Sequence, residues 1–327
     1  MNKKIVFLLS LMALTACTKQ QTTGIHLENL DTTAVAQNDF YQYACGGWMK
    51  NNPIPDEYSR FGSFDKLGLS NLEQVNGLIA DIAAGTHKMG SIPQKIGDVY
   101  NLSMDTARRN QEGIAPVLPV LQEIENVTDK AQWSEVLGKA MDFGLWAMYV
   151  DADAMNSSMN ILNEYQAGFA LSQKDYYIDE DEHTKHIREE YVKHVEKMFE
   201  LFGQENAAEK AQTVLRLETR LANAALSNVE LRDPVANYNK MSVEELQKLV
   251  PEVDWKVYFA GLNIAPDSLS VGQVRHLQEA GKMLAEESLE DMKTLFTWQV
   301  IDGSADFLTE EIFMQNFEFY GRILSGR

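Results

Sequence analysis

An arginine among aromatic side chains, with a carboxylate close by, is the feature of this sequence with the clearest chemical use. Arg60 is followed by Phe61 and Phe64, and Asp65 comes directly after Phe64. A guanidinium group is a planar fork of donors, which can hold a ligand carboxylate through two parallel hydrogen bonds. The pattern therefore predicts a carboxylate-binding site at Arg60, with Asp65 near enough to hold the fork in place. A structural salt bridge of Arg60 is the alternative interpretation.

The segment that carries Arg60 is unusual in composition. DFYQYACGGWMKNNPIPDEYSRFGSFD, residues 39–65, holds seven aromatic residues, two prolines, the pair Gly46-Gly47 and Cys45. The glycines allow a close backbone approach or a positive φ, and the prolines favour an extended chain. We therefore expect a compact, aromatic-rich segment that does not form one helix.

Histidines and acidic residues give two further candidate sites. His183, His186, Glu190 and His194 are spaced 3, 4 and 4 residues apart on an expected helix, which would suit a metal-binding stripe or a solvated helix face. The acidic run 179–184 (DEDEHT) could attract calcium, but it lacks the spacing and the central glycine of an EF-hand loop. A charge cluster at a helix N-terminus is the alternative for this run.

The first residues have the pattern of a bacterial lipoprotein signal. Lys3 and Lys4 precede an apolar run, residues 5–16, that is too short to span a bilayer. The run ends in LTAC, which resembles a lipobox, so we expect residues 1–16 to be a signal peptide and Cys17 to carry lipid. Residues 17–38 are polar and are expected to be a tether. The expected location is the bacterial cell envelope, outside the cytoplasm, with a lipid anchor to a membrane. An ordinary signal peptide is the alternative.

Composition limits the class of protein and its partners. The 327 residues are 45% apolar, which is typical of a globular chain with a real core, and the net charge is −19. Nucleic-acid binding requires basic surface to neutralise phosphate, so we expect no nucleic-acid partner. If Cys17 is lipidated, Cys45 is left without a disulfide partner in the chain.

The hydrophobic periodicity predicts a mainly α-helical fold with a minor β-hairpin. The hairpin is expected at residues 145–166, around the polar centre 151–158. Helices are expected over 69–83, 92–110, 115–125, 130–143, 182–202, 207–228, 242–249, 254–262, 270–286, 288–303 and 309–324. They must position the segment that carries Arg60.

Four ordered motifs carry a resemblance to a known family. They are DFYQYACGGWMKNNPIPDEYSRFGSFDKL from residue 39, KIGDVYNLSMD from residue 95, FALSQKDYYIDE from residue 169 and ANAALSNVELRDPVANYNKMSVEELQ from residue 222. Together they resemble the N-terminal domain of the neprilysin and endothelin-converting-enzyme family of zinc metallopeptidases, which includes the bacterial PepO-type endopeptidases. The resemblance runs from residue 39 to the end of the chain.

The resemblance implies a fold, an activity and a role for Arg60. It implies that residues 39–327 form the N-terminal domain of a two-lobed zinc peptidase, with the catalytic C-terminal domain absent from this chain. The family arginine at the position of Arg60 binds the free C-terminal carboxylate of a peptide substrate, and Phe64 and Asp65 match residues beside it. Gly68 replaces a second arginine of the mammalian enzyme, which makes dipeptide release doubtful. The cysteine that matches Cys45 bridges to the C-terminal half in animal enzymes.

Zinc chemistry requires residues that this sequence does not contain. The family binds zinc through H-E-x-x-H and a later glutamate, and none of the six histidines stands in that motif. We therefore expect no catalytic or metal-binding residue here, zinc being held by the C-terminal half. The expected function is that of a zinc metalloendopeptidase acting on oligopeptides, represented by its substrate-enclosing lobe. The alternatives are a non-catalytic peptide-binding envelope lipoprotein and a purely structural helical lipoprotein.

Overall fold

The computed structural model describes residues 26–326 except 57, 59 and 141. The signal peptide, Cys17 and residues 18–25 of the tether lie outside the described residues. The chain divides into two compact units, residues 1–74 and 75–327. Within the described residues, no helix is both long enough and apolar enough to cross a membrane.

In the first unit, a short turn packs against the helix α2 (Phe40–Asn51) at the glycine pair. A Cβ on Gly47 would lie 2.4 Å from the carbonyl oxygen of Glu28, so this contact requires glycine. Asp39 caps α2 by accepting a hydrogen bond from the Gln42 amide nitrogen at 2.8 Å. The glycines thus provide the expected close approach. They do not interrupt the helix, however, and only after Asn51 does the chain become non-helical.

The long helix α3 (Ser63–Ala84) follows, and its second half belongs to the second unit. There it packs against α4 (Ile92–Met104) through a small-residue contact, in which a Cβ on Gly97 would lie 3.3 Å from the Ala83 Cα. The expected helix over 92–110 is wrong as one element. Asp105 ends α4 and caps α5 (Thr106–Glu112), accepting from the Arg108 amide nitrogen at 3.0 Å.

The second unit contains a sheet of four strands in the order β1-β2-β4-β3. The predicted hairpin is confirmed as β1 (Trp146–Asp153) and β2 (Asn156–Gln166), which pair antiparallel. Two short strands extend the sheet: β4 (Ser268–Val271) pairs parallel with β2, and β3 (Asn239–Ser242) pairs antiparallel with β4.

The strand β4 corrects the expected helix over 270–286. Ser270 lies in β4 opposite Asn163, and the helix begins only at Val274, after the turn at Gly272 and Gln273. The turn needs glycine, because a Cβ on Gly272 would lie 2.7 Å from the carbonyl oxygen of Glu164. Pairing with β2 therefore outweighs the local helical periodicity.

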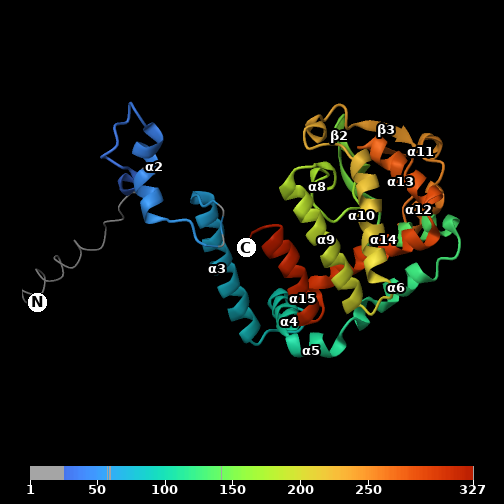
Figure 1. The fold of residues 1–327 in the computed structure, drawn as a ribbon, viewed down its shortest axis with the longest axis horizontal. Helices are drawn as coiled ribbons and strands as arrows, with labels where there is room; N and C mark the ends of the chain where they lie inside the picture. Colours follow the sequence, from blue (N-terminus) through green and yellow to red (C-terminus); the bar gives the residue numbers. More distant parts are fainter. Residues whose placement is uncertain (1–25, 57, 59, 141, 327) are drawn as a thin grey trace, which may run out of the picture. The chain divides into compact units, whose positions relative to one another are not determined.

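The remaining elements of the second unit are helical and cover the sheet or pack on one another (Figure 1). The α-helices are α6 (Leu118–Glu125), α7 (Trp133–Lys139), α8 (Asp175–Ile178), α9 (Glu182–Leu201), α10 (Ala207–Ala224), α11 (Val243–Leu249), α12 (Trp255–Gly261), α13 (Val274–Glu286), α14 (Leu289–Ser304) and α15 (Glu310–Phe317). A π-helical segment, Glu318–Ile323, follows α15 within the range predicted as one helix. The fold is mainly α with a small sheet, as predicted.

Two apolar cores meet along α10 and α14. Leu217 and Phe296 belong to the core between the sheet and α7, α12 and α13. Val214 and Trp298 belong to the second core, which α9, α15 and the π-helical segment complete. Figure 1 shows α9 and α10 side by side, and their contacts confirm it. The shared helices α10 and α14 therefore join the two cores into one body.

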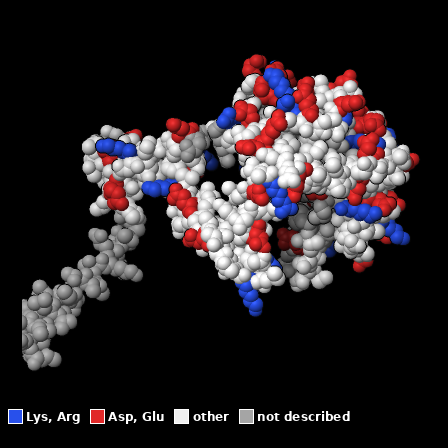
Figure 2. All heavy atoms as spheres, turned by 90° about the horizontal axis from the view of Figure 1, so that it is seen from below, with Lys and Arg blue, Asp and Glu red and all other residues white. Residues whose placement is uncertain are grey.

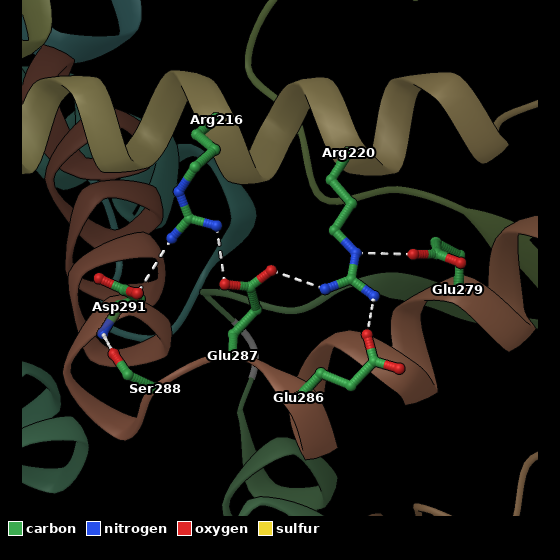
Figure 3. Close-up of polar contacts among 7 residues, drawn as sticks. All are labelled: Arg216, Arg220, Glu279, Glu286, Glu287, Ser288 and Asp291. Carbon is green, nitrogen blue, oxygen red and sulfur yellow. Dashed lines mark hydrogen bonds and ion pairs between the residues drawn. The ribbon is translucent and has the colours of Figure 1, made fainter.

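A network of ion pairs fixes α10 to α13 and α14 (Figure 3). The Arg220 guanidinium donates to three carboxylates, at 2.6 Å to Glu279, 2.5 Å to Glu286 and 2.6 Å to Glu287. Arg216 donates to Glu287 at 2.7 Å and to Asp291 at 2.9 Å. Since one carboxylate serves both arginines, the pairs act as a network rather than as isolated surface salt bridges.

Candidate functional site

Aromatic contacts connect the residues around Arg60 to α2. Phe61 stacks on Trp48, with ring centroids 6.3 Å apart, and meets Tyr58 edge-on at 5.4 Å. Lys66 in the first turn of α3 donates to the Asn52 side chain at 2.7 Å, beside the end of α2. The connection between α2 and α3 is thus held at both ends, and Arg60 directly precedes Phe61, whose ring is packed against Trp48 and Tyr58.

Arg60, Phe64 and Asp65 are close in sequence, but their side chains have different surroundings in the structure. Arg60 is exposed, and among the described residues it has no ion-pair partner. The Phe64 ring is 87% exposed. Asp65 is half-buried and accepts a hydrogen bond from the Gly62 amide nitrogen at 2.7 Å, so its carboxylate caps α3 instead of holding the Arg60 fork. The assignment of these three residues to substrate binding stays a prediction.

Neither cysteine is part of a described disulfide. Cys45 lies half-buried in α2 with a free thiol. Cys17 lies outside the described residues, so its lipidation stays a prediction.

The two alternative metal sites have ordinary structural roles. His183 and His186 are exposed on α9, whereas His194 lies on the buried face, where it stacks on Phe319 with ring centroids 4.9 Å apart. Burial lowers the pKa of His194 to about 3, which keeps it neutral. Asp181 caps α9 by accepting from the Thr184 amide nitrogen at 3.0 Å. The acidic run 179–184 therefore lies at a helix N-terminus.

The described residues do not fit a zinc ion. No group of three or more His, Cys, Asp and Glu side chains within them is arranged to bind a metal. The complete sequence also has no H-E-x-x-H. We therefore derive no catalytic step from this chain's own residues.

A buried carboxylate that the sequence analysis missed joins α8, α9 and α10. Glu218 on α10 accepts from the Tyr191 hydroxyl at 2.7 Å, the Tyr177 hydroxyl at 3.0 Å and the Ala170 amide nitrogen at 3.1 Å. Burial raises the pKa of Glu218 to about 8, although the two hydroxyls lower it. Trp298 in turn donates to the Tyr191 hydroxyl at 2.8 Å. Because every partner is internal, this cluster links helices and offers no group to a ligand.

A signal for such residues exists in the sequence. Glu218 stands between Leu217 and Leu221 in the apolar stripe of α10, and Asp302 follows Ile301 in the stripe of α14. A carboxylate at a core-facing helical position is costly to bury without partners. Such a position therefore predicts a buried polar contact.

Surface charge and exposed apolar residues distinguish parts of the second unit. On the face drawn in Figure 2, Asp and Glu outnumber Lys and Arg, and the two signs are interspersed. Apolar side chains are exposed along α3 and α4, among them Leu78, Ile92 and Val99, which are 61%, 74% and 65% exposed. Near the C-terminal helices, Phe307 and Met314 are exposed large apolar residues.

Comparison with known proteins identifies the family. The model of the N-terminal domain of peptidase family M13 matches residues 36–327. Endothelin-converting enzyme-like 1 of Mus musculus is 30% identical over 244 residues, which cover 70% of this chain and 31% of the relative. Human endothelin-converting enzyme 1 is 28% identical over 245 residues, which cover 71% and 31%. The chain thus spans about a third of the length of these relatives.

Solved structures have the same fold. The zinc metalloprotease Zmp1 of Mycobacterium tuberculosis, in complex with an inhibitor, matches with a TM-score of 0.84 and 29% identity over 93% of this chain and 47% of that chain. PepO of Lactobacillus rhamnosis, at 20% identity and a TM-score of 0.71, shares the fold over 90% of this chain and 47% of its own. The motifs, the two-lobed relatives and the family match agree, and the chain belongs to peptidase family M13.

Proposed function

We propose that this chain is the substrate-enclosing N-terminal lobe of a zinc metalloendopeptidase that hydrolyses peptide bonds in oligopeptides. The observation that carries the proposal is the family match over residues 36–327, together with the fold of a zinc metalloprotease over 93% of the chain. Zinc would activate the attacking water, and its ligands would come from a C-terminal catalytic domain. This chain alone is expected not to hydrolyse peptides, because its sequence has no H-E-x-x-H.

Within this proposal, Arg60 positions the substrate. Its guanidinium is exposed, unpaired among the described residues and next to the buttressed Phe61 ring, so it is accessible to a peptide carboxylate. A charge-assisted, bidentate contact would hold the substrate C-terminus and leave the scissile bond to the catalytic domain. Phe64, with its exposed ring, would contact the adjacent substrate side chain, and Asp65 would keep the start of α3 in place.

The exposed apolar faces of α3 and α4 support the presence of a further domain. Exposed apolar side chains recur along both helices, at Leu78 in α3 and at Ile92, Val99 and Leu102 in α4. Several exposed apolar side chains on two neighbouring helices are typical of a protein–protein contact. We propose that the catalytic domain covers part of this surface.

The chain is further proposed to be anchored in the bacterial cell envelope through lipid on Cys17, by the lipobox-like LTAC. A second function is capture of peptides by a lipoprotein without catalysis, which would use the exposed Arg60 but no catalytic domain. The two functions differ in the size of the native protein. An immunoblot of source cells with an antibody against residues 60–320 should give a band near twice the size of this chain. A band at the chain's own size would instead support peptide capture.

The role of Arg60 has its own test. In the two-lobed protein, Arg60→Met should raise KM for peptides with a free C-terminus by about tenfold or more and leave KM for amidated peptides nearly unchanged, because only the former present a carboxylate. Lys50→Met, at an exposed cation in α2, serves as the control. Equal effects on both peptides would exclude carboxylate binding by Arg60.

A further inference from the structure

A cavity of about 460 Å³ opens in the second unit between the start of β1 and the end of α14. Its walls include the aromatic side chains of Phe143, Trp146, Phe169, Tyr258 and Trp298. A volume of this order is typical of small-ligand sites, which are also largely apolar with a few polar groups.

One wall of the cavity is held rigidly by hydrogen bonds. The Gln299 side chain accepts from the Gly144 amide nitrogen at 2.9 Å and donates to the carbonyl oxygens of Gly144 and Gly168 at 3.1 and 3.2 Å. These bonds join α14 to the two loops that flank β1 and β2. The Gln299 amide is therefore committed to the protein, and the cavity is preformed.

Asp302, one turn further along α14, is different. Asp302 is half-buried and lines the cavity, whereas its Oδ1 atom is closed off from solvent. Burial raises the pKa of Asp302 to about 7, and the neighbouring Tyr320 hydroxyl, a donor within the protein, lowers it in part. The ionised carboxylate of Asp302 would attract a cationic donor in the cavity more strongly than a neutral one.

The charge of the cavity selects the ligand. Among its described lining residues there are two carboxylates, Asp142 and Asp302, and no Lys, Arg or His. Aromatic ring faces also attract cations, whereas an anion would meet only repulsion. Asp142 is exposed and only Asp302 is half-buried, and two carboxylates do not supply the roughly six to eight oxygen ligands that calcium, for example, takes.

We propose that this cavity binds a primary ammonium group on an apolar stem, with Asp302 as its counter-ion and the aromatic walls around the stem. A free alkylamine and the lysine side chain of a peptide present the same chemistry. The proposal concerns the second unit alone and does not depend on the peptidase function.

The test compares hexylammonium with hexan-1-ol, which has the same stem without the charge. Binding to the full chain is measured by tryptophan fluorescence, since Trp146 and Trp298 line the cavity, and by calorimetry at pH 8. Burial gives Asp302 a pKa of about 7, so its carboxylate is ionised at that pH. Hexylammonium should bind about tenfold or more tightly than the alcohol. Equal affinities would overturn the proposal, whether or not any variant folds.

Variants identify the counter-ion. Asp302→Asn keeps the side-chain shape and should abolish the preference for the amine over the alcohol. Asp267→Asn, at an exposed aspartate outside the cavity, should leave the preference unchanged. If Asp302→Asn retained the preference, or if Asp142→Asn removed it instead, the assignment to Asp302 would be wrong.

A second arm distinguishes the two sources of the ligand. The blocked tripeptide acetyl-Gly-Lys-Gly-amide is compared with its norleucine analogue as a competitor of hexylammonium. If only the lysine peptide displaces hexylammonium, a peptide ligand is supported. If hexylammonium binds and neither peptide displaces it, a free amine is supported. Equal competition by both peptides contradicts ammonium recognition.

Discussion

Glu164 on β2 makes the stability of this protein depend on pH in a way that one substitution can isolate. The residue is almost fully buried, its Oε2 accepts from the Gln273 amide nitrogen at 3.3 Å, and its Oε1 has no partner among the described residues. Burial raises the pKa of this carboxyl to about 8, against the partial opposing effect of the backbone N–H groups of Gln273 and Gly272. The folded state therefore retains a proton that the unfolded chain releases.

The sign and the size of the effect follow from the two pKa values. Below pH 4.5, the ordinary value, the carboxyl is protonated in both states and stability is greatest. Between pH 4.5 and about 8 only the folded state holds the proton, so each rise in pH favours unfolding, and the loss is complete above pH 8. The difference of 8 − 4.5 = 3.5 pH units, at about 1.4 kcal/mol per unit, gives an upper value of about 5 kcal/mol.

Glu164→Gln removes this titration and keeps the shape. The carbonyl of the new side-chain amide can still accept from the Gln273 amide nitrogen. Its NH₂ group takes the position of Oε1, where it has no hydrogen-bond acceptor, and this unsatisfied donor costs about 1–3 kcal/mol at every pH. The variant should therefore be no more stable than the wild type at pH 5. By pH 9 its free energy of unfolding should have gained several kcal/mol relative to the wild type.

Urea unfolding of the full chain at pH 5, 7 and 9 measures this difference. Glu218 and Asp302 also have pKa values raised by burial, so the wild type and the variant should both lose stability as pH rises, the variant less. Glu311→Gln, at an exposed position, should follow the wild type at every pH. Parallel stability–pH curves for Glu164→Gln and the wild type would refute the reasoning.

Two further substitutions test packing and charge. Gly138→Ala should lower the free energy of unfolding by about 1–3 kcal/mol in urea unfolding, because the new Cβ would lie 2.3 Å from the backbone oxygen of Tyr258. The control is Gly77→Ala in α3, whose Cβ meets open space and which should be neutral or stabilising. A neutral Gly138→Ala would contradict the contact. Arg220→Met should cost about 1–3 kcal/mol at low salt and less in 1 M NaCl, because it removes three ion pairs, whereas Arg322→Met, which removes one exposed pair, should change little. An equal effect of both arginine substitutions would show that the Arg220 network adds nothing beyond isolated pairs.

The helices and the hairpin could be predicted because their signals are local. Hydrophobic periodicity and caps such as Ser242 and Ser288 are written in consecutive residues, and the hairpin strands β1 and β2 are adjacent in the chain. The family could be recognised for a similar reason, since its motifs are continuous runs of sequence. The family match confirms it.

What failed depends on contacts distant in sequence. The strands β3 and β4 have four residues each, and β4 is a strand because it pairs with β2 more than a hundred residues earlier. A pattern that only separates apolar from charged residues predicts that Glu218 and Asp302 face solvent. Their positions within the apolar stripes of α10 and α14 instead place them towards the core.

The predicted substrate-binding residues and the buried carboxylates differ in whether the described part of the chain supplies their polar partners. Glu218 has its donors within this chain, so its role is fixed by the fold and is structural. Arg60 is exposed and has no partner among the described residues, yet the neighbouring aromatic contacts hold the backbone on either side of it. A cation without a partner among the described residues, on a backbone whose neighbouring rings are packed, suits a partner from outside, because less backbone entropy is lost on binding. The free and amidated peptides test this inference directly, since they differ only in the carboxylate that would complete the site.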